Sequence, residues 1–212
     1  MEEKQLLIAA VKPRCRVLGP GERFVIWVQG CPFSCPGCVA ESMRSFDAGK
    51  VVSVAELEAA ILRTEGIEGI TVSGGEPFLQ AEELADLFGR IRRQKDLGII
   101  VYTGFYYERL KGLASEHGEI AEMLSHIDLL IDGPYEEQNN LNYGLKGSVN
   151  QRALAFTERY QNDLHLYNDA GSVRKSELYQ DEAGTFMAGV PSKDMEQKWK
   201  ALKARTGGRK EV

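Results

Sequence analysis

Three of the four cysteines in this 212-residue chain lie close together, at positions 31, 35 and 38. Cys31, Cys35 and Cys38 have the spacing C-x-x-x-C-x-x-C on a loop that also contains two prolines and a glycine. Thiolates this close in sequence can converge on one soft metal centre, and three ligands leave a coordination position open. The spacing therefore predicts an iron-sulfur cluster in which one iron has no cysteine ligand and could bind a substrate.

Two non-catalytic interpretations of the cysteines stay open at this point. A structural zinc site would need a fourth ligand, and the three histidines, His117, His126 and His165, show no pairing that would supply it. A ferredoxin-type electron carrier would need a fourth cysteine, for which Cys15 is the candidate. We interpret Cys15 instead as a small buried hydrophobic residue.

A second chemical element is Gly74-Gly75-Glu76-Pro77, which directly follows an apolar run. Glycines allow a ligand to approach the backbone closely, and Glu76 adds a negative charge for an ammonium group. The alternative is a simple turn between a strand and a helix. Because this segment comes one strand-helix unit after the cysteine loop, we favour a role in binding.

Apolar strands and amphipathic helices alternate along the chain that carries these elements. The predicted strands are Phe24–Val28, Ile70–Val72, Gly98–Tyr102 and Asp128–Ile131, and the predicted helices span residues 54–64, 82–93 and 120–127. This alternation predicts an α/β fold with a mostly parallel sheet, either open or curled toward a barrel. Ligand-binding loops follow the carboxyl ends of such strands, so we expect the cysteine loop, Gly74–Glu76, Thr103 and Asp132 to converge on one site.

The remaining segments give weaker patterns. They predict a first strand at Leu6–Val11, a helix at Gln151–Tyr160, a fifth strand at Leu164–Tyr167 and a hairpin that pairs Glu177–Gln180 with Thr185–Val190. We expect one domain over residues 1–191. Residues 192–212 form a charged tail, predicted to be helical around Trp199 and Leu202 and frayed at residues 207–210.

Composition limits the classes of partner and compartment. The net charge of −5 and pI near 5.4 provide no basic face for nucleic acid. No stretch approaches the roughly 20 apolar residues of a membrane helix, and the N-terminal apolar run is too short for a signal peptide. Four cysteines are too few for a disulfide scaffold in a chain of this size, so we expect a cytoplasmic protein. The charge and the apolar runs lead us to expect no nucleic-acid partner and no membrane partner.

Several motifs together resemble one enzyme family. They are Gly19-Pro20-Gly21-Glu22-Arg23-Phe24 leading to the cysteine motif, the Gly-Gly-Glu-Pro segment, Val101-Tyr102-Thr103-Gly104-Phe105, Leu130-Ile131-Asp132-Gly133-Pro134 and Gly147-Ser148-Val149-Asn150-Gln151-Arg152. The chain resembles the radical S-adenosylmethionine (SAM) enzymes over about residues 6–191. Within them it is most similar to the activating enzymes of glycyl radical enzymes, of the type that serves the anaerobic ribonucleotide reductase.

The resemblance implies a fold, two cofactors and a reaction. The fold would be a partial, open β/α barrel, and Cys31, Cys35 and Cys38 would hold a [4Fe-4S] cluster whose fourth iron binds SAM. Reductive cleavage of SAM would give a 5′-deoxyadenosyl radical that removes a hydrogen atom from a glycine α-carbon of a large glycyl radical enzyme. A flavodoxin- or ferredoxin-type protein would supply the electron.

The resemblance also implies roles for residues outside the cysteine loop. Gly74, Gly75 and Glu76 would meet the methionine amino group of SAM, Thr103 would lie near its ribose or carboxylate, and Asp132 would stand beside it. Asn150 matches the Gly-Ser-x-Asn-Gln-Arg motif and is expected at the cofactor site, with the alternative that it caps a following helix.

Residues on both sides of the last cysteine depart from patterns of the wider family or of the activases, although the reductase-activating type also has Cys-Pro-Gly-Cys at this point. Val39 and Ala40 replace an aromatic and a polar residue, and Gly37 stands where many radical SAM enzymes have an aromatic residue beside the adenine. These departures leave open an alternative, a radical SAM enzyme that modifies another peptide or a small molecule. The non-catalytic zinc or electron-transfer module remains the alternative of a different class.

Overall fold

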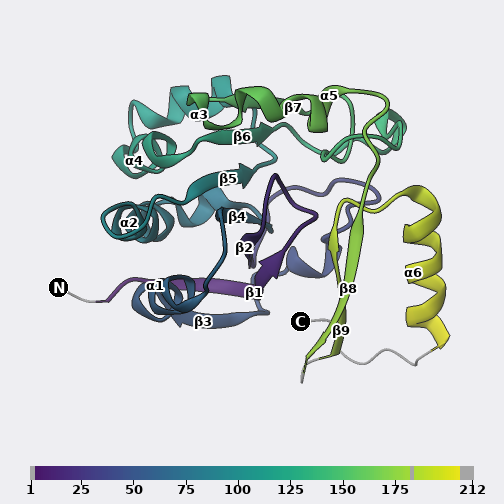
Figure 1. Ribbon diagram of the computed structural model, residues 1–212, viewed down its shortest axis with the longest axis horizontal. Coiled ribbons are helices and arrows are strands. Elements are labelled where there is room, and N and C mark those ends of the chain that lie inside the picture. Colours follow the sequence, from purple (N-terminus) through teal and green to yellow (C-terminus); the bar gives the residue numbers. More distant parts are fainter. Residues whose placement is uncertain (1–2, 182–183, 206–212) are drawn as a thin grey trace.

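The protein is an α/β structure built on one seven-stranded sheet, seen in a computed structural model that describes residues 3–181 and 184–205 (Figure 1). The strand order is β3-β1-β2-β4-β5-β6-β7. The strands are β1 (Gln5–Cys15), β2 (Arg23–Val28), β3 (Lys50–Ser53), β4 (Gly69–Gly74), β5 (Gly98–Tyr102), β6 (Leu129–Asp132) and β7 (Arg152–Ala155). The four neighbours β2, β4, β5 and β6 are parallel, and the outer pairings are antiparallel.

The central strands alternate their apolar side chains between two covered faces. In β2, Phe24, Ile26 and Val28 point into the largest core cluster, whereas Val25 and Trp27 belong to a second cluster on the other face. Strands buried on both faces are uniformly apolar, because neither face meets water. The predicted α/β fold with its mostly parallel sheet is confirmed. The antiparallel pairings of the outer strands could not be predicted from the alternation of strands and helices.

Helices from the crossovers cover the face that carries the largest cluster. They are α1 (Val54–Arg63), α2 (Ala81–Arg92), α3 (Tyr107–Ala114) and α4 (Gly118–His126), gathered on one side of the sheet in Figure 1. The predicted apolar stripe of α2 is confirmed, since Leu84, Leu87, Phe88 and Ile91 are all fully buried. Short 3₁₀ turns η1 (Glu41–Met43), η2 (Pro77–Gln80) and η3 (Glu137–Asn139) lie in the connecting loops.

The opposite face is covered by the C-terminal part of the chain. It contains η4 (Glu158–Asp163), α5 (His165–Asn168), the antiparallel hairpin β8 (Ser176–Asp181) and β9 (Gly184–Gly189), and α6 (Lys193–Arg205). Ala188 of β9 is fully buried in the cluster that contains Trp27. The predicted hairpin and the predicted C-terminal helix are confirmed, and the predicted fraying at residues 207–210 lies outside the described residues.

Two predictions between residues 151 and 167 are wrong. The helix predicted at Gln151–Tyr160 is instead β7, which pairs antiparallel with β6, followed by η4, so Asn150 caps no helix there. The strand predicted at Leu164–Tyr167 is the short helix α5. In both segments tertiary packing outweighs local pattern, because β7 covers the open edge of β6 and Tyr167 is fully buried against the sheet.

Among residues 3–181 and 184–205, none of the helices has the length and apolar composition that a membrane span requires.

Replacing Ser53 with alanine is expected to lower the free energy of unfolding by about 1 kcal/mol. Ser53 caps α1: its hydroxyl accepts from the Glu56 amide at 3.2 Å, and the Glu56 carboxylate accepts from the Ser53 amide at 2.9 Å. Urea unfolding would measure the change. Ser125→Ala is the control, because that exposed hydroxyl donates only to Glu122 O within α4, and a loss in Ser53→Ala no larger than the control's would contradict the capping role.

Candidate functional site

The cysteine loop leaves the carboxyl end of β2 and is fastened at both ends. The amides of Gly30 and Cys31 donate to the carbonyls of Met43 and Arg44, at 2.9 and 3.1 Å. Gln29, almost fully buried, donates through Nε2 to Ser45 O at 2.7 Å. These bonds join the start of the loop to its end, so the three cysteines lie on one closed loop beside the carboxyl end of β2.

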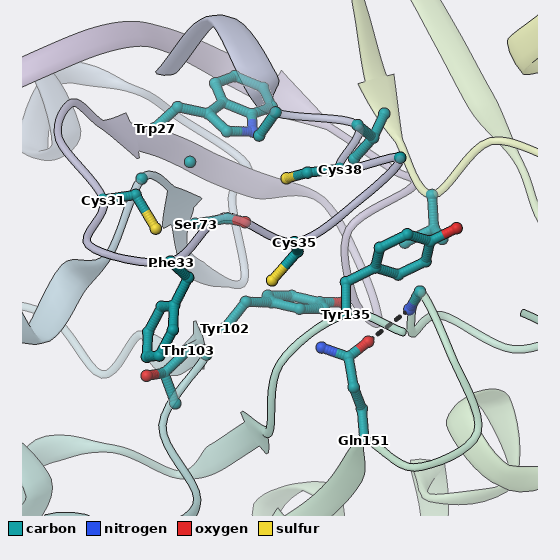
Figure 2. A pocket seen from close by; sticks show the side chains of 18 of the residues that line it. Trp27, Cys31, Phe33, Cys35, Cys38, Ser73, Tyr102, Thr103, Tyr135 and Gln151 are labelled. Atoms are coloured by element: carbon teal, nitrogen blue, oxygen red, sulfur yellow. Dashed lines mark hydrogen bonds between the residues drawn. The ribbon is translucent and has the colours of Figure 1, made fainter. Parts of the chain in front are cut away.

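All three cysteines of the loop line one pocket above the carboxyl ends of the parallel strands (Figure 2). Residues from the ends of β4, β5 and β6 also line it, namely Ser73, Gly74, Gly75, Glu76, Tyr102, Thr103, Gly104 and Gly133. The predicted meeting of the cysteine loop with these strand ends is thus present in the structure. Cys15 lies elsewhere, fully buried in the cluster around Trp27.

Burial makes Cys31 and Cys38 weaker acids than ordinary thiols. Burial raises the pKa of Cys31 to about 11, and it also raises the pKa of Cys38. A metal centre binds thiolates, so its assembly must displace these protons.

Glu76 is buried at the polar end of the pocket and is held by three hydrogen bonds. Its carboxylate accepts from the Thr103 hydroxyl and the Gly104 amide, each at 2.8 Å, and from the Phe78 amide at 3.0 Å. Burial raises the pKa of Glu76 to about 7, against the opposing effect of those donors. The ends of β4 and β5 are thereby joined into one polar wall.

The free energy of unfolding of the unloaded protein is expected to fall by about 2 kcal/mol between about pH 5.5 and 8.5 because of Glu76. The folded pKa, about 7, lies above the ordinary value of 4.5, so the folded state binds the proton more tightly. The resulting stabilisation is complete below the unfolded pKa and is lost as the pH rises through the folded pKa. Urea unfolding across this range should show the fall in the wild type and in Glu122→Gln, an exposed control, but not in Glu76→Gln. Parallel pH profiles for the wild type and Glu76→Gln would contradict the assignment.

The glycines of this wall are required by close packing of the chain on itself. A Cβ on Gly75 would lie 2.2 Å from Gly30 O, and one on Gly104 would lie 2.6 Å from the Phe33 ring. Gly74 has a positive φ of 101° and packs against the backbone of Val28. The Gly-Gly-Glu segment therefore sits directly against the start of the cysteine loop.

Asp132 and Asn150 are close to the pocket but are engaged with the protein. Asp132 is fully buried, and its carboxylate accepts from Arg152 Nε at 2.9 Å and from the Tyr107 amide at 2.8 Å. Asn150 donates to Pro134 O at 2.8 Å, while its Oδ1 is buried with no hydrogen-bond partner among the described residues. Neither side chain is among those that line the pocket, and their contact with a cofactor stays a prediction.

Several lining residues had not been singled out from the sequence. Gln151 spans the loop before β7, since it accepts from the Gly147 amide at 2.8 Å and donates to Gly133 O at 2.9 Å. The Gly-Ser-x-Asn-Gln-Arg motif contained that signal. Aromatic and C-terminal residues complete the lining, among them Trp27, Phe33, Tyr135, Arg174, Val190, Pro191 and Glu196. The C-terminal ones had no local signal, because only tertiary folding brings them to the site.

The donor set of the pocket fits a [4Fe-4S] cluster with one open iron. Three free thiols of one loop face it, and no fourth cysteine lines it. Within the part of the chain that the structure describes, no three histidine, cysteine or carboxylate side chains close on a single metal ion. In a four-iron cluster each thiolate binds a different iron, so the ligands need not converge on one point. Cys31, Cys35 and Cys38 are the residues that would hold it.

The family described as 4Fe-4S single cluster domain matches residues 17–154, which include the cysteine loop and the strand ends around the pocket. The chain belongs to this family. The matched range includes the three-cysteine loop and the Gly-Gly-Glu wall, and the description of the family favours a [4Fe-4S] cluster over zinc.

Relatives of known function share about two thirds of the chain. The anaerobic ribonucleoside-triphosphate reductase-activating protein of Enterobacteria phage T4 is 32% identical over 67% of this chain and 89% of its own length. The protein of the same name from Vibrio cholerae is 29% identical, over 66% and 92%. Pyruvate formate-lyase 1-activating enzyme of Escherichia coli is 28% identical over 68% of this chain and 58% of that protein. The sequence-based assignment to the radical SAM activating enzymes, with a [4Fe-4S] cluster and SAM as cofactors, is confirmed.

Proposed function

We propose that this protein activates a glycyl radical enzyme of the anaerobic ribonucleotide reductase type. The observation that carries the proposal is the pocket in which three free thiols face the Glu76–Thr103 wall, in a chain related to reductase-activating proteins over most of their length. When bound, the reduced cluster and SAM supply a 5′-deoxyadenosyl radical, which takes a hydrogen atom from a glycine α-carbon of the partner. The chain itself must bind SAM, exclude water and admit a glycine-bearing segment.

The residues around the pocket can perform these tasks. The carboxylate of Glu76, held by Thr103 and Gly104, offers a negative site for the amino group of SAM. Phe33 lines the pocket, and its ring meets that of Phe105 edge to face with centroids 5.0 Å apart. Apolar lining of this kind helps to exclude water from a reactive radical.

Anaerobic reconstitution with iron, sulfide, SAM, a reductant and an anaerobic ribonucleotide reductase tests the proposal. Electron paramagnetic resonance should detect a glycyl radical in the partner, and a partner with its radical glycine replaced by alanine should give none. Formation of 5′-deoxyadenosine without a glycyl radical would overturn the choice of substrate and favour the alternative, a radical SAM enzyme acting on another peptide or a small molecule.

We also propose a flavodoxin- or ferredoxin-type protein as the electron donor, in the cytoplasm. Four free cysteines suit a reducing compartment, and such donors supply the low potential at which [4Fe-4S] clusters are reduced. Absorbance bleaching of the cluster by reduced flavodoxin or ferredoxin would test the donor. A cluster that both leave oxidised while dithionite reduces it would contradict this proposal alone.

A further inference from the structure

The C-terminal hairpin and the first turn of α6 form part of the cysteine pocket. We call residues 174–181 and 184–196 the C-terminal strap. The strap lies beyond residue 154, where the match to the family ends, yet its residues Arg174, Gly189, Val190, Pro191 and Glu196 line the pocket. The pocket of this chain is therefore completed by a segment that the family motifs do not include.

One end of the strap is fastened by Arg174 to the loop before β7. Its guanidinium donates to the carbonyls of Lys146 and Gly147, at 2.7 and 2.9 Å, and to Pro191 O at 3.2 Å. Arg174 also donates to Asn140 Oδ1 at 2.9 Å. A single side chain thus ties the loop that carries Gln151 to the segment that carries Val190 and Pro191.

The hairpin of the strap is fastened to the edge of the sheet. Glu177 accepts from the Arg16 amide at 3.1 Å and forms an ion pair with Lys12 at 3.4 Å. Tyr179 stacks on Trp27, with ring centroids 6.5 Å apart. Val190 packs against the same cluster as Trp27. These contacts hold the strap as a fixed wall of the pocket.

The two sides of the pocket differ in chemistry. Figure 2 shows Cys31 and Thr103 on one side and Tyr135 and Gln151 on the other, with the yellow-green strap passing on the side of Tyr135. The first side carries the polar wall of Glu76. The second carries Tyr135 and Gln151 (Figure 2). The strap adds the apolar Val190 and Pro191 to the lining, together with the charged Arg174 and Glu196.

The chemistry of SAM matches this division. Its methionine end is zwitterionic and suits the open iron and the Glu76 wall, whereas its adenine is flat and largely apolar and suits aromatic and aliphatic surfaces. The cysteine loop itself offers only Gly37, Val39 and Ala40 beside its last cysteine. Other elements that line the pocket, the strap among them, supply further apolar surface for the adenine.

We propose that the C-terminal strap forms the adenine-facing wall of the SAM pocket through Val190 and Pro191, with Arg174 as the positioning residue. This inference rests on the proposed use of SAM and adds the segment that determines affinity for its adenosine end. Removing the apolar surface of Val190 should then weaken binding of the adenosine end of SAM and leave binding of its methionine end unchanged.

Equilibrium dialysis of labelled SAM against the anaerobically reconstituted full chain tests the strap. Val190→Ser and Arg174→Met should each weaken SAM binding about tenfold and should weaken displacement by 5′-deoxyadenosine by the same factor. Displacement by L-methionine should stay within about twofold of the wild type. Val173→Ser, with Val173 76% exposed just before the strap, is the matched control and should leave all three ligands unchanged.

The outcomes separate the strap from the proposed function. Thermal unfolding and iron content check that each variant is folded and contains its cluster. Val190→Ser is a small change at a half-buried position, so it keeps the test valid if Arg174→Met does not fold. Unchanged SAM binding in Val190→Ser would overturn the strap proposal alone. An equal loss of affinity for methionine and for 5′-deoxyadenosine would overturn it too, because a wall that contacts adenine affects only the adenosine end of SAM. Failure of the wild type to bind SAM would overturn the proposed function as well.

Discussion

Replacing Cys35 with alanine is expected to reduce cluster iron and sulfide to roughly a tenth of the wild-type content or less and to abolish SAM cleavage. Cys35 lies midway along the loop, and its carbonyl accepts from the Cys38 amide at 3.3 Å. Two thiolates cannot hold a cluster that needs three protein ligands, and no fourth cysteine lines the pocket to replace the missing one. Anaerobic reconstitution followed by iron and sulfide analysis measures the loss.

Cys15→Ala is the matched control for this experiment. Cys15 is the same residue type in the same chain, but it is fully buried in the cluster with Val17 and Trp27, and burial raises its pKa to about 11. A thiol in that position is a small hydrophobic residue, so its loss should cost about 1 kcal/mol of folding free energy and leave the cluster intact. Loss of iron in Cys15→Ala, or its retention in Cys35→Ala, would show that the ligand set is wrong.

The central part of the site could be predicted because local pattern and topology agree there. Each apolar strand ends in a loop with polar or glycine residues, and parallel strands bring those loops to one edge of the sheet. The structure accordingly places the cysteines, Gly74–Glu76 and Thr103 around one pocket. Roles that depend on side-chain partners were less accessible: Asp132 is engaged by Arg152, twenty positions away in the sequence.

The chain after residue 150 was harder to predict for a physical reason. The segment before Tyr160 has apolar residues that suit a helix, yet residues 152–155 pair with the edge of β6 because an unpaired strand edge would otherwise be exposed. The strap reaches the pocket through long-range contacts such as those of Arg174 with the loop at 144–147. No periodicity in the sequence encodes contacts of that kind.

Arg23 is a further residue whose role depends on long-range partners, and it carries the second large predicted effect. Its side chain is fully buried at the start of β2, and Gly69 of the paired strand leaves room for it, since a Cβ there would lie 2.5 Å from the guanidinium. Its five donors are used on neutral oxygens of Pro20, Ile70, Thr71, Gly98 and Tyr160, at 2.6 to 3.2 Å. The guanidinium also lies over the Tyr160 ring, 5.4 Å from its centroid.

Arg23→Met should therefore lower the free energy of unfolding by about 3 kcal/mol, since buried acceptors lose a charged donor and only the desolvation of the charge is recovered. Arg23→Lys should cost at least as much, because an ammonium has three donors and cannot reproduce the planar fork. Tyr160→Phe, which removes one acceptor, should cost about 1 to 2 kcal/mol. Urea unfolding of the unloaded protein measures all three.

The control for Arg23→Met is Arg16→Met, the same substitution seven positions earlier. The Arg16 side chain is 72% exposed and forms an ion pair with Glu22 at 3.4 Å. Exposed ion pairs contribute little, so its change should stay within about 0.5 kcal/mol. Similar losses at Arg23 and Arg16 would contradict the interpretation. A large loss at Arg23 alone would show that the start of β2 is held by a buried charge that has no carboxylate partner among the described residues. The parallel pair β2–β4, which carries the cysteine loop and the Gly-Gly-Glu wall at its other end, would then depend on that charge for its register.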